Sequence, residues 1–143
     1  MPVGISVLIP VYDYNPRVLL ESLIQQASSL AVPVEICVAD DGSPVPVAQY
    51  LPADISAGIF LHRNDSNQGR AATRRTLAEL AGHDYLLFID ADSEIPDNQF
   101  LQRYAGQLSS LPAVVTGGRI YPDQQPSDCR LALHWTYGHR RES

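Results

Sequence analysis

Lysine is absent from this chain of 143 residues, whose ten basic side chains are all arginine, and long hydrophobic runs are absent as well. No apolar stretch approaches the roughly 20 residues that a membrane-crossing helix needs, so we expect no transmembrane segment within the chain. The first residues carry no basic side chain ahead of their apolar run, so they do not resemble a secretory signal. A cytoplasmic location is therefore our default expectation.

Cysteine is scarce, and positive charge is in deficit. The two cysteines, Cys37 and Cys129, lie far apart, which excludes a disulfide framework and a CxxC metal site. The formal net charge of −6 argues against a general nucleic-acid binder. With 45% hydrophobic and 18% charged residues, the chain has the composition of a folded protein, and its length suits one domain.

Short apolar segments rich in β-branched residues alternate with amphipathic segments along the chain. We expect strands near residues 5–11, 34–39, 58–62, 85–89 and 113–121, and helices near 16–30, 70–80 and 96–108. Residues 45–51 fit a loop or a short helix, and residues 126–143 could begin another helix. The alternation predicts an α/β fold with a mostly parallel sheet flanked by helices, which binds ligands beyond the carboxyl ends of its strands.

Aspartates gather where two of the expected strands end. Asp40 and Asp41 follow the second strand, and Asp90 and Asp92 follow the fourth, so all four should project into one crevice. Clustered carboxylates need a positive partner, and oxygen ligands suit Mg²⁺ or Mn²⁺, commonly held by one or two carboxylates together with substrate phosphates. The alternative is that Asp40 and Asp90 only cap turns or helices.

A second phosphate signal lies where the 70–80 helix is expected to begin. The N–H groups at a helix N-terminus attract anions, and the string Asn-Gln-Gly-Arg precedes this helix at residues 67–70. Arg70 and Arg74 are four residues apart and share a helix face, whereas Arg75 points elsewhere and can pair with Glu79. A solvated basic face explains Arg70 and Arg74 equally well.

Four strings of the chain resemble a known family. ISVLIPVY at 5–12, VADDGS at 38–43, NQGRA at 67–71 and LFIDAD at 87–92 are similar to motifs of family-2 glycosyltransferases with the GT-A fold. The resemblance covers about residues 4–121. It implies a Rossmann-like fold and an inverting glycosyltransferase that moves a sugar from a nucleoside diphosphate sugar, a UDP- or GDP-sugar, to an acceptor that the sequence does not identify.

The same resemblance implies residues for the nucleoside pocket. Pro10 and Tyr12 would line the pocket for the base. Asp41 would bind the base or the ribose, with Asp40 supporting it.

For the diphosphate, the resemblance implies a DxD motif. Asp92, its last residue, would be the metal ligand, and Asp90 would lie near both the ribose and the cation, which is Mg²⁺ or Mn²⁺. Arg70 or Arg74 would face the base or the diphosphate.

The chain departs from the family where the catalytic base is concerned. The family's general base usually lies well beyond the DxD motif, in the acceptor half, and none of the acids after Asp92 sits in a matching context. We therefore assign no catalytic base, and we interpret residues 1–143 as a single donor-binding domain, truncated before the acceptor half.

Other readings lead to different functions. The chain could be a non-catalytic nucleotide-binding module or a truncated remnant. A nucleotidyltransferase should carry a Gly-rich loop after the first strand, and residues 10–14 are not such a loop. A receiver domain should carry its acidic pair after the first strand, whereas here the pair follows the second.

Apolar surface left uncovered on a half-domain should drive self-association into a homo-oligomer. The basic residues 139–141 would fit a membrane-adjacent position in a longer protein, but three residues do not decide it.

Overall fold

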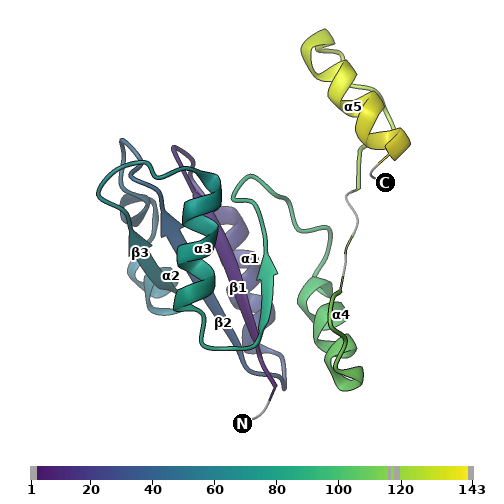
Figure 1. Cartoon of the computed structure of the whole chain (residues 1–143). Coiled ribbons are helices and arrows are strands. Elements are labelled where there is room, and N and C mark those ends of the chain that lie inside the picture. Colours follow the sequence, from purple (N-terminus) through teal and green to yellow (C-terminus); the bar gives the residue numbers. More distant parts are fainter. Residues whose placement is uncertain (1–2, 116, 118–119, 142–143) are drawn as a thin grey trace. The chain divides into compact units, whose positions relative to one another are not determined.

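The computed structural model describes residues 3–115, 117 and 120–141 (Figure 1). It divides the chain into two compact units, Met1–Leu111 and Pro112–Ser143. The expectation of one domain over residues 1–143 stays a prediction, because a division into compact units does not by itself define separate domains.

A parallel sheet forms the centre of the first unit. Its four strands are β1 (Ile5–Val11), β2 (Val34–Asp40), β3 (Phe60–Arg63) and β4 (Tyr85–Phe88), in the order β3-β2-β1-β4. Every neighbouring pair is parallel, with Val11 opposite Asp40 and Leu8 opposite Phe88. The predicted parallel α/β class is therefore confirmed. Because β1 lies between β2 and β4, the segments that follow all three strands emerge at the same end of the sheet.

Helices cover both faces of this sheet. They are α1 (Arg17–Ser28), α2 (Ala53–Ala57), α3 (Arg70–Leu80) and α4 (Phe100–Gln107), with short 3₁₀ helices η1 (Val47–Tyr50) and η2 (Leu108–Ser110). Figure 1 shows α3 on one side of the sheet and α1 on the other. The second unit contains α5 (Cys129–Arg141). Among the described residues, no helix is long and apolar enough to cross a membrane.

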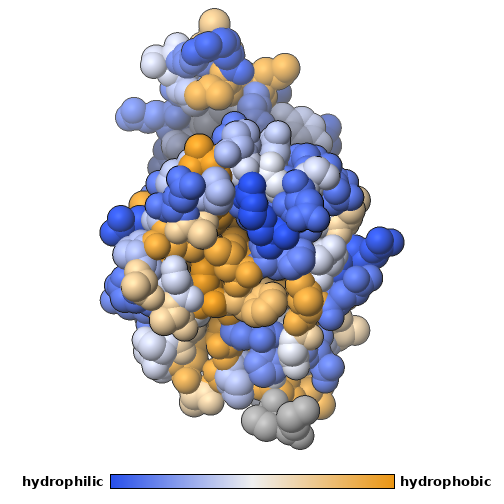
Figure 2. All heavy atoms as spheres, turned by 90° about the vertical axis from the view of Figure 1, so that its left-hand side faces the viewer, coloured by the Kyte–Doolittle hydropathy of each residue, from blue (hydrophilic) through white to orange (hydrophobic). Residues whose placement is uncertain are grey.

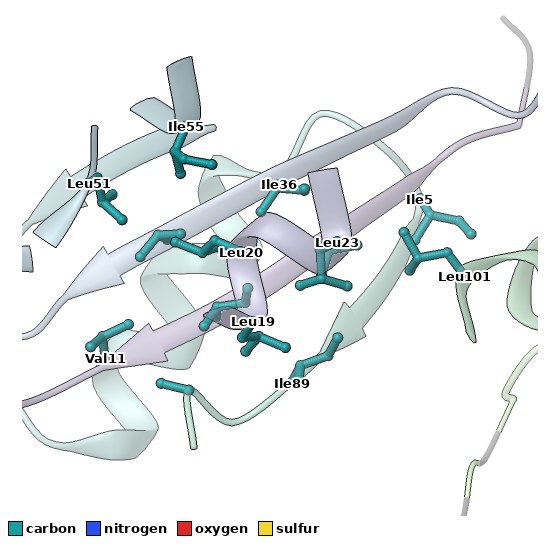
Figure 3. Close-up of a cluster of buried hydrophobic side chains, with 14 of the residues drawn as sticks. Ile5, Val11, Leu19, Leu20, Leu23, Ile36, Leu51, Ile55, Ile89 and Leu101 are labelled. Atoms are coloured by element: carbon teal, nitrogen blue, oxygen red, sulfur yellow. The ribbon is translucent and has the colours of Figure 1, made fainter. Parts of the chain in front are cut away.

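The alternation of side chains along β1 explains this layering, because successive residues of a strand face opposite sides. Ile5, Val7, Ile9 and Val11 belong to the larger core cluster, whereas Leu8 packs with Leu77 of α3 in a smaller one. Figure 3 shows side chains of α1 directed at β1 and β2 in the larger cluster. The buried sheet centre thus holds the ends of the strands in fixed positions.

The expected strand at 113–121 is wrong for the described part of that segment. Residues 113–115, 117 and 120–121 form no strand, while 116, 118 and 119 lie outside the described residues. The pair Val114 and Val115 favours a strand by composition. However, the described part of this segment pairs with no strand, and an extended segment without a partner cannot complete its backbone hydrogen bonds.

Two helix boundaries also differ from expectation. The helix expected from residue 96 begins at Phe100, because Asp97 Oδ1 accepts a hydrogen bond from the N–H of Gln99 at 2.8 Å and holds a turn there. The helix expected within 126–143 begins at Cys129.

Candidate functional site

A cleft with a volume of ≈ 390 Å³ opens at the carboxyl ends of the central strands. Its walls come from the loop after β1, the beginning of α3 and the segment after β4. Six of the predicted site residues line it: Pro10, Tyr12, Asp41, Arg70, Asp90 and Asp92. The sequence reasoning therefore located the cleft, but Asp40 and Arg74 are not part of its lining.

Asp40 does not face the cleft, and the prediction that all four aspartates project into one crevice is wrong for this residue. Its side chain is 2% exposed, pairs with Arg63, and accepts hydrogen bonds from the N–H groups of Ser43 at 2.9 Å and Val47 at 3.0 Å. The physical reason is the strand period of two, which turns Asp40 and Asp41 in opposite directions. Asp40 therefore shapes the loop after β2.

The pKa of Asp40 is lowered although burial alone acts to raise it. Hydrogen bonds from Ser43 and Val47 and the guanidinium of Arg63 favour the charged form and outweigh the burial. The carboxylate is thus an ionised structural group beneath the cleft.

Asp41 faces the cleft with its carboxylate held by the loop that precedes α3. It accepts hydrogen bonds from Asn64 Nδ2 at 2.7 Å and from the backbone N–H groups of Gln68 at 2.8 Å and Gly69 at 3.0 Å. Burial acts to raise the pKa of Asp41, but these donors and the side chain of Thr73 outweigh it and leave the pKa lowered. The cleft therefore contains a carboxylate that is ionised and fixed before any ligand arrives.

Gly42 lets the two loops approach each other this closely. It has φ +71°, and a Cβ there would lie 2.6 Å from the backbone carbonyl carbon of Ser66. Only glycine fits both the left-handed backbone and the contact. The sequence thus needs glycine directly after the acidic pair for Asp41 to meet the 66–69 loop.

Asp90 is neutralised by arginines of α3. Arg74 Nη2 lies 2.5 Å from Asp90 Oδ1, and Arg70 Nη2 lies 3.3 Å from Asp90 Oδ2. The guanidinium of Arg74 also lies over the ring of Phe88, 5.4 Å from its centroid. Arg74 therefore supports Asp90 from outside the cleft, whereas Arg70, with a side chain that is 74% exposed, lines it.

Asp92 is exposed, and in the described part of the chain it has no hydrogen-bond or ion-pair partner. No group of three or more His, Cys, Asp or Glu side chains that could hold a metal ion occurs among the described residues. The donor set still fits Mg²⁺ or Mn²⁺ that arrives with a diphosphate, since one or two carboxylates are then sufficient. Asp92, with Asp90 beside it, provides them.

Aromatic side chains line the mouth of the cleft. Tyr12 is 53% exposed, and Tyr14, which the sequence reasoning did not select, is 47% exposed and lines the cleft too. Between them, Asp13 adopts φ +48°, and its N–H donates to Ser43 Oγ at 3.0 Å. Exposed aromatic rings of this kind are suited to stacking on a planar base.

Two further residues near Asp41 escaped the sequence reasoning. Thr73 is buried and lines the cleft, and Asn64 donates a hydrogen bond to Asp41. Nothing in the spacing of the sequence links Asn64 to Asp41. The position of Thr73 between Arg70 and Arg74 was the available signal, because it places Thr73 on the same turn of the helix.

Comparison with known proteins identifies the family. The family model described as "Glycosyl transferase family 2" matches residues 6–143. The chain belongs to this family. Among curated relatives of this family-2 chain, an uncharacterized glycosyltransferase of Haemophilus influenzae is 37% identical over 90 residues, which are 62% of this chain and 29% of that protein. YibD of Escherichia coli, also an uncharacterized glycosyltransferase, is 33% identical over 96 residues, 64% of this chain and 26% of that protein.

Solved structures show the same fold. TarS 1–349 of Staphylococcus aureus in complex with UDP-GlcNAc superposes with a TM-score of 0.61 at 20% identity, covering 88% of this chain and 39% of that one. The mannosyltransferase PcManGT of Pyrobaculum calidifontis, in complex with GDP-Man and Mn²⁺, gives 0.60 at 20% identity, covering 93% and 40%. The predicted Rossmann-like GT-A fold is confirmed, and the family-2 chain spans less than half the length of these proteins.

Proposed function

We propose that this chain supplies the donor-binding part of an inverting glycosyltransferase that uses a nucleoside diphosphate sugar and Mg²⁺ or Mn²⁺. The observation that carries the proposal is the cleft at the strand ends, which is lined by the fixed carboxylate of Asp41, by the exposed guanidinium of Arg70 and by Asp92, whose carboxylate has no partner among the described residues. The UDP-GlcNAc and GDP-Man complexes of proteins with this fold support it. The inverting course rests on the family resemblance.

The nucleoside would bind at the end of the cleft that holds Asp41. Pro10 and Tyr12 provide the apolar wall for the base, and the ionised Asp41 accepts a hydrogen bond from the base or the ribose. Asp40 supports this arrangement indirectly, by holding the loop in which Asp41 lies.

The diphosphate would bind between the DxD segment and α3. Asp92, with Asp90 beside it, would hold the cation, and the bound cation neutralises the charge that develops on the leaving diphosphate. Arg70 can exchange its contact with Asp90 for a phosphate oxygen, because its side chain is exposed and the contact is long. Arg74 stays on Asp90 and keeps its carboxylate in place.

Calorimetry of nucleotide binding tests this proposal. We expect UDP or GDP to bind the 143-residue chain at least about tenfold more tightly with Mn²⁺ or Mg²⁺ than with chelator, which is about 1.4 kcal/mol. Asp92→Asn should lose this enhancement. Asp84→Asn, an exposed aspartate directly before β4 at the opposite end of the sheet, is the matched control and should keep it. Metal-independent binding would contradict the role of Asp92.

A non-catalytic nucleotide-binding module is the second candidate. The observation in its favour is that none of the described acids after Asp92 lines the cleft, so we assign no general base. Incubation of the chain with UDP- and GDP-sugars separates the two functions: release of the nucleoside diphosphate with Mn²⁺ supports an enzyme, and stoichiometric binding without release supports a module.

Self-association of the chain is a further part of the proposal. Figure 2 shows apolar atoms gathered on the face that carries β3 and α2. Phe60 on the edge strand β3 is 50% exposed, and exposed apolar edge strands favour pairing between copies. We expect light scattering to report a dimer or larger species and Phe60→Lys to shift it to a monomer. A monomeric wild-type chain would refute self-association.

A cytoplasmic location stays a prediction.

A further inference from the structure

Ser43 lies in the loop after β2, where its side chain is buried and all of its polar groups are engaged. Its N–H donates to Asp40 Oδ1 at 2.9 Å, and its carbonyl oxygen accepts from Arg63 Nη2 at 2.9 Å. Its Oγ accepts from the N–H of Asp13 at 3.0 Å. Burial acts to raise the pKa of Asp40, and the hydroxyl of Ser43, which donates to this carboxylate, acts to lower it. The ion pair of Asp40 with Arg63 therefore holds Ser43 in one place.

Asp13 has the left-handed backbone conformation, with φ +48°. An L-residue with a Cβ is strained in this region, although aspartate tolerates it better than most residues do. The side chain of Asp13 is exposed, so packing of that side chain contributes little to the turn. Its N–H, by contrast, is directed at the fixed Oγ of Ser43. This hydrogen bond therefore stabilises the left-handed turn.

The turn at Asp13 sets the course of the chain at the mouth of the cleft. Tyr12 precedes it and Tyr14 follows it, and all three residues line the cleft. A change of φ at one residue redirects the chain on either side of it, because the backbone has only two soft dihedral angles per residue. Both rings are exposed, so packing fixes them only in part. The directions of the two rings therefore depend on the conformation of Asp13.

We propose that Ser43 is a positioning residue that fixes the segment from Tyr12 to Tyr14 through the N–H of Asp13, so that the affinity of the cleft for a nucleoside depends on a buried hydroxyl outside it. Ser43 is not among the residues that line the cleft, and it acts through Asp13. This inference rests on the proposed function, in which the aromatic mouth contacts the nucleoside and not the diphosphate. Loss of the hydroxyl therefore weakens the nucleoside contacts and leaves the metal and phosphate part unchanged.

Replacement of Ser43 gives the first measurement. In calorimetry with Mn²⁺, Ser43→Ala should weaken the binding of UDP about fivefold, since the turn loses one hydrogen bond. Pyrophosphate has no base or ribose, so its affinity should be unchanged. An equal loss for UDP and pyrophosphate would show a merely structural role, and an unchanged affinity for UDP would show no role; either result overturns the inference.

Ser6 offers a closely matched control at the other end of β1. Its side chain is buried, and its hydroxyl also donates to a carboxylate, that of Glu35, and accepts from a backbone N–H, that of His83 at 3.1 Å. Ser6→Ala should therefore destabilise the fold much as Ser43→Ala does, while leaving the affinity for UDP unchanged. A loss of UDP affinity in Ser6→Ala as large as that in Ser43→Ala would assign the effect to stability and overturn the inference.

Two substitutions of the exposed Asp13 test the turn without disturbing the core. Both remove the carboxylate, but Asp13→Gly tolerates φ +48° freely, whereas the β-branched side chain of Asp13→Val disfavours it. We expect Asp13→Gly to bind UDP at least about fivefold more tightly than Asp13→Val, with equal affinities for pyrophosphate. Equal affinities of these two variants for UDP would overturn the inference, also where Ser43→Ala does not fold.

The proposed function fails in a different way from this inference. A wild-type chain that binds neither UDP nor pyrophosphate with Mn²⁺ would refute the proposed function. The results that overturn the inference instead compare variants of a chain that binds both.

Discussion

The loops after β2 and β4 carry similar pairs of aspartates in opposite physical states. Asp40 and Asp41 after β2 are buried, and each carboxylate accepts hydrogen bonds from two backbone N–H groups and pairs with a further side chain. After β4, Asp90 is balanced by two partly exposed arginines, and Asp92 is exposed. Asp40 is therefore used by the fold alone and Asp41 is held in place at the cleft, whereas Asp92 has no partner among the described residues. Similar residue types in similar places thus differ in how far folding alone satisfies their carboxylates.

We expect the largest loss of stability when Asp40 is replaced. Asp40→Ala should lower the free energy of unfolding by about 3 kcal/mol, because the buried donors of Ser43 and Val47 lose their acceptor and Arg63 loses its partner. Urea denaturation measures this. Arg63→Ala should be milder, since the carboxylate keeps both backbone donors. A loss within about 0.5 kcal/mol for Asp40→Ala would remove the distinction between the two loops.

Low pH should weaken the stabilisation that the loop after β2 provides. The folded-state pKa values of Asp40 and Asp41 are lowered, so their contribution to stability is fully present above the ordinary aspartate pKa and is lost as the pH falls through the lowered values. We expect the free energy of unfolding to fall progressively below about pH 4. Urea titrations between pH 7 and pH 2 measure this, and Asp40→Asn should flatten the acid limb. An acid limb equally steep in that variant would contradict the assignment.

A smaller effect is expected for the arginine that supports Asp90. Arg74→Ala removes a partly exposed ion pair and the contact with the ring of Phe88, which together should lower stability by about 1 kcal/mol. Arg75→Ala is the control, because its contact with Glu79 at 3.6 Å is exposed on both sides and should contribute no more than about 0.5 kcal/mol. Equal thermal midpoints for the two variants would show that Asp90 needs no support.

The smallest effect on stability is expected at Asp92. Asp92→Ala should change the free energy of unfolding by no more than about 0.5 kcal/mol, because its carboxylate has no partner in the described chain. Differential scanning calorimetry without and with Mn²⁺ and UDP completes the contrast. The wild-type midpoint should rise with both ligands present, and that of Asp92→Ala should rise less. A marked loss of stability without ligand would show that Asp92, like Asp40, stabilises the fold.

The sequence predicted the sheet where burial controls it. The strands 5–11 and 34–39 are continuous apolar runs, and the structure places them at β1 and β2 with nearly these bounds. The same reasoning failed for the described residues of 113–121, because β-branched composition signals extended backbone without indicating whether a partner strand is present.

Prediction of the site was limited by two things: the direction in which a side chain points, and contacts between loops that are distant in sequence. The strand-end rule located the cleft and brought Asp41, Asp90 and Asp92 to it. It did not separate Asp40 from Asp41, although the period of two along a strand contains that information. Asn64 was out of reach, because its contact with Asp41 depends on how the loops after β2 and β3 pack and not on any local pattern.

The position of β1 between β2 and β4 has a consequence for biosynthesis. β1 leaves the ribosome first, but the cleft at its end requires β4 and Asp92, which are translated much later, and parallel pairings of this kind form slowly. A nascent chain that ends before β4 therefore exposes an edge of β1 and lacks the segment that completes the cleft. Until β4 emerges, that edge of β1 is open to pairing with other chains.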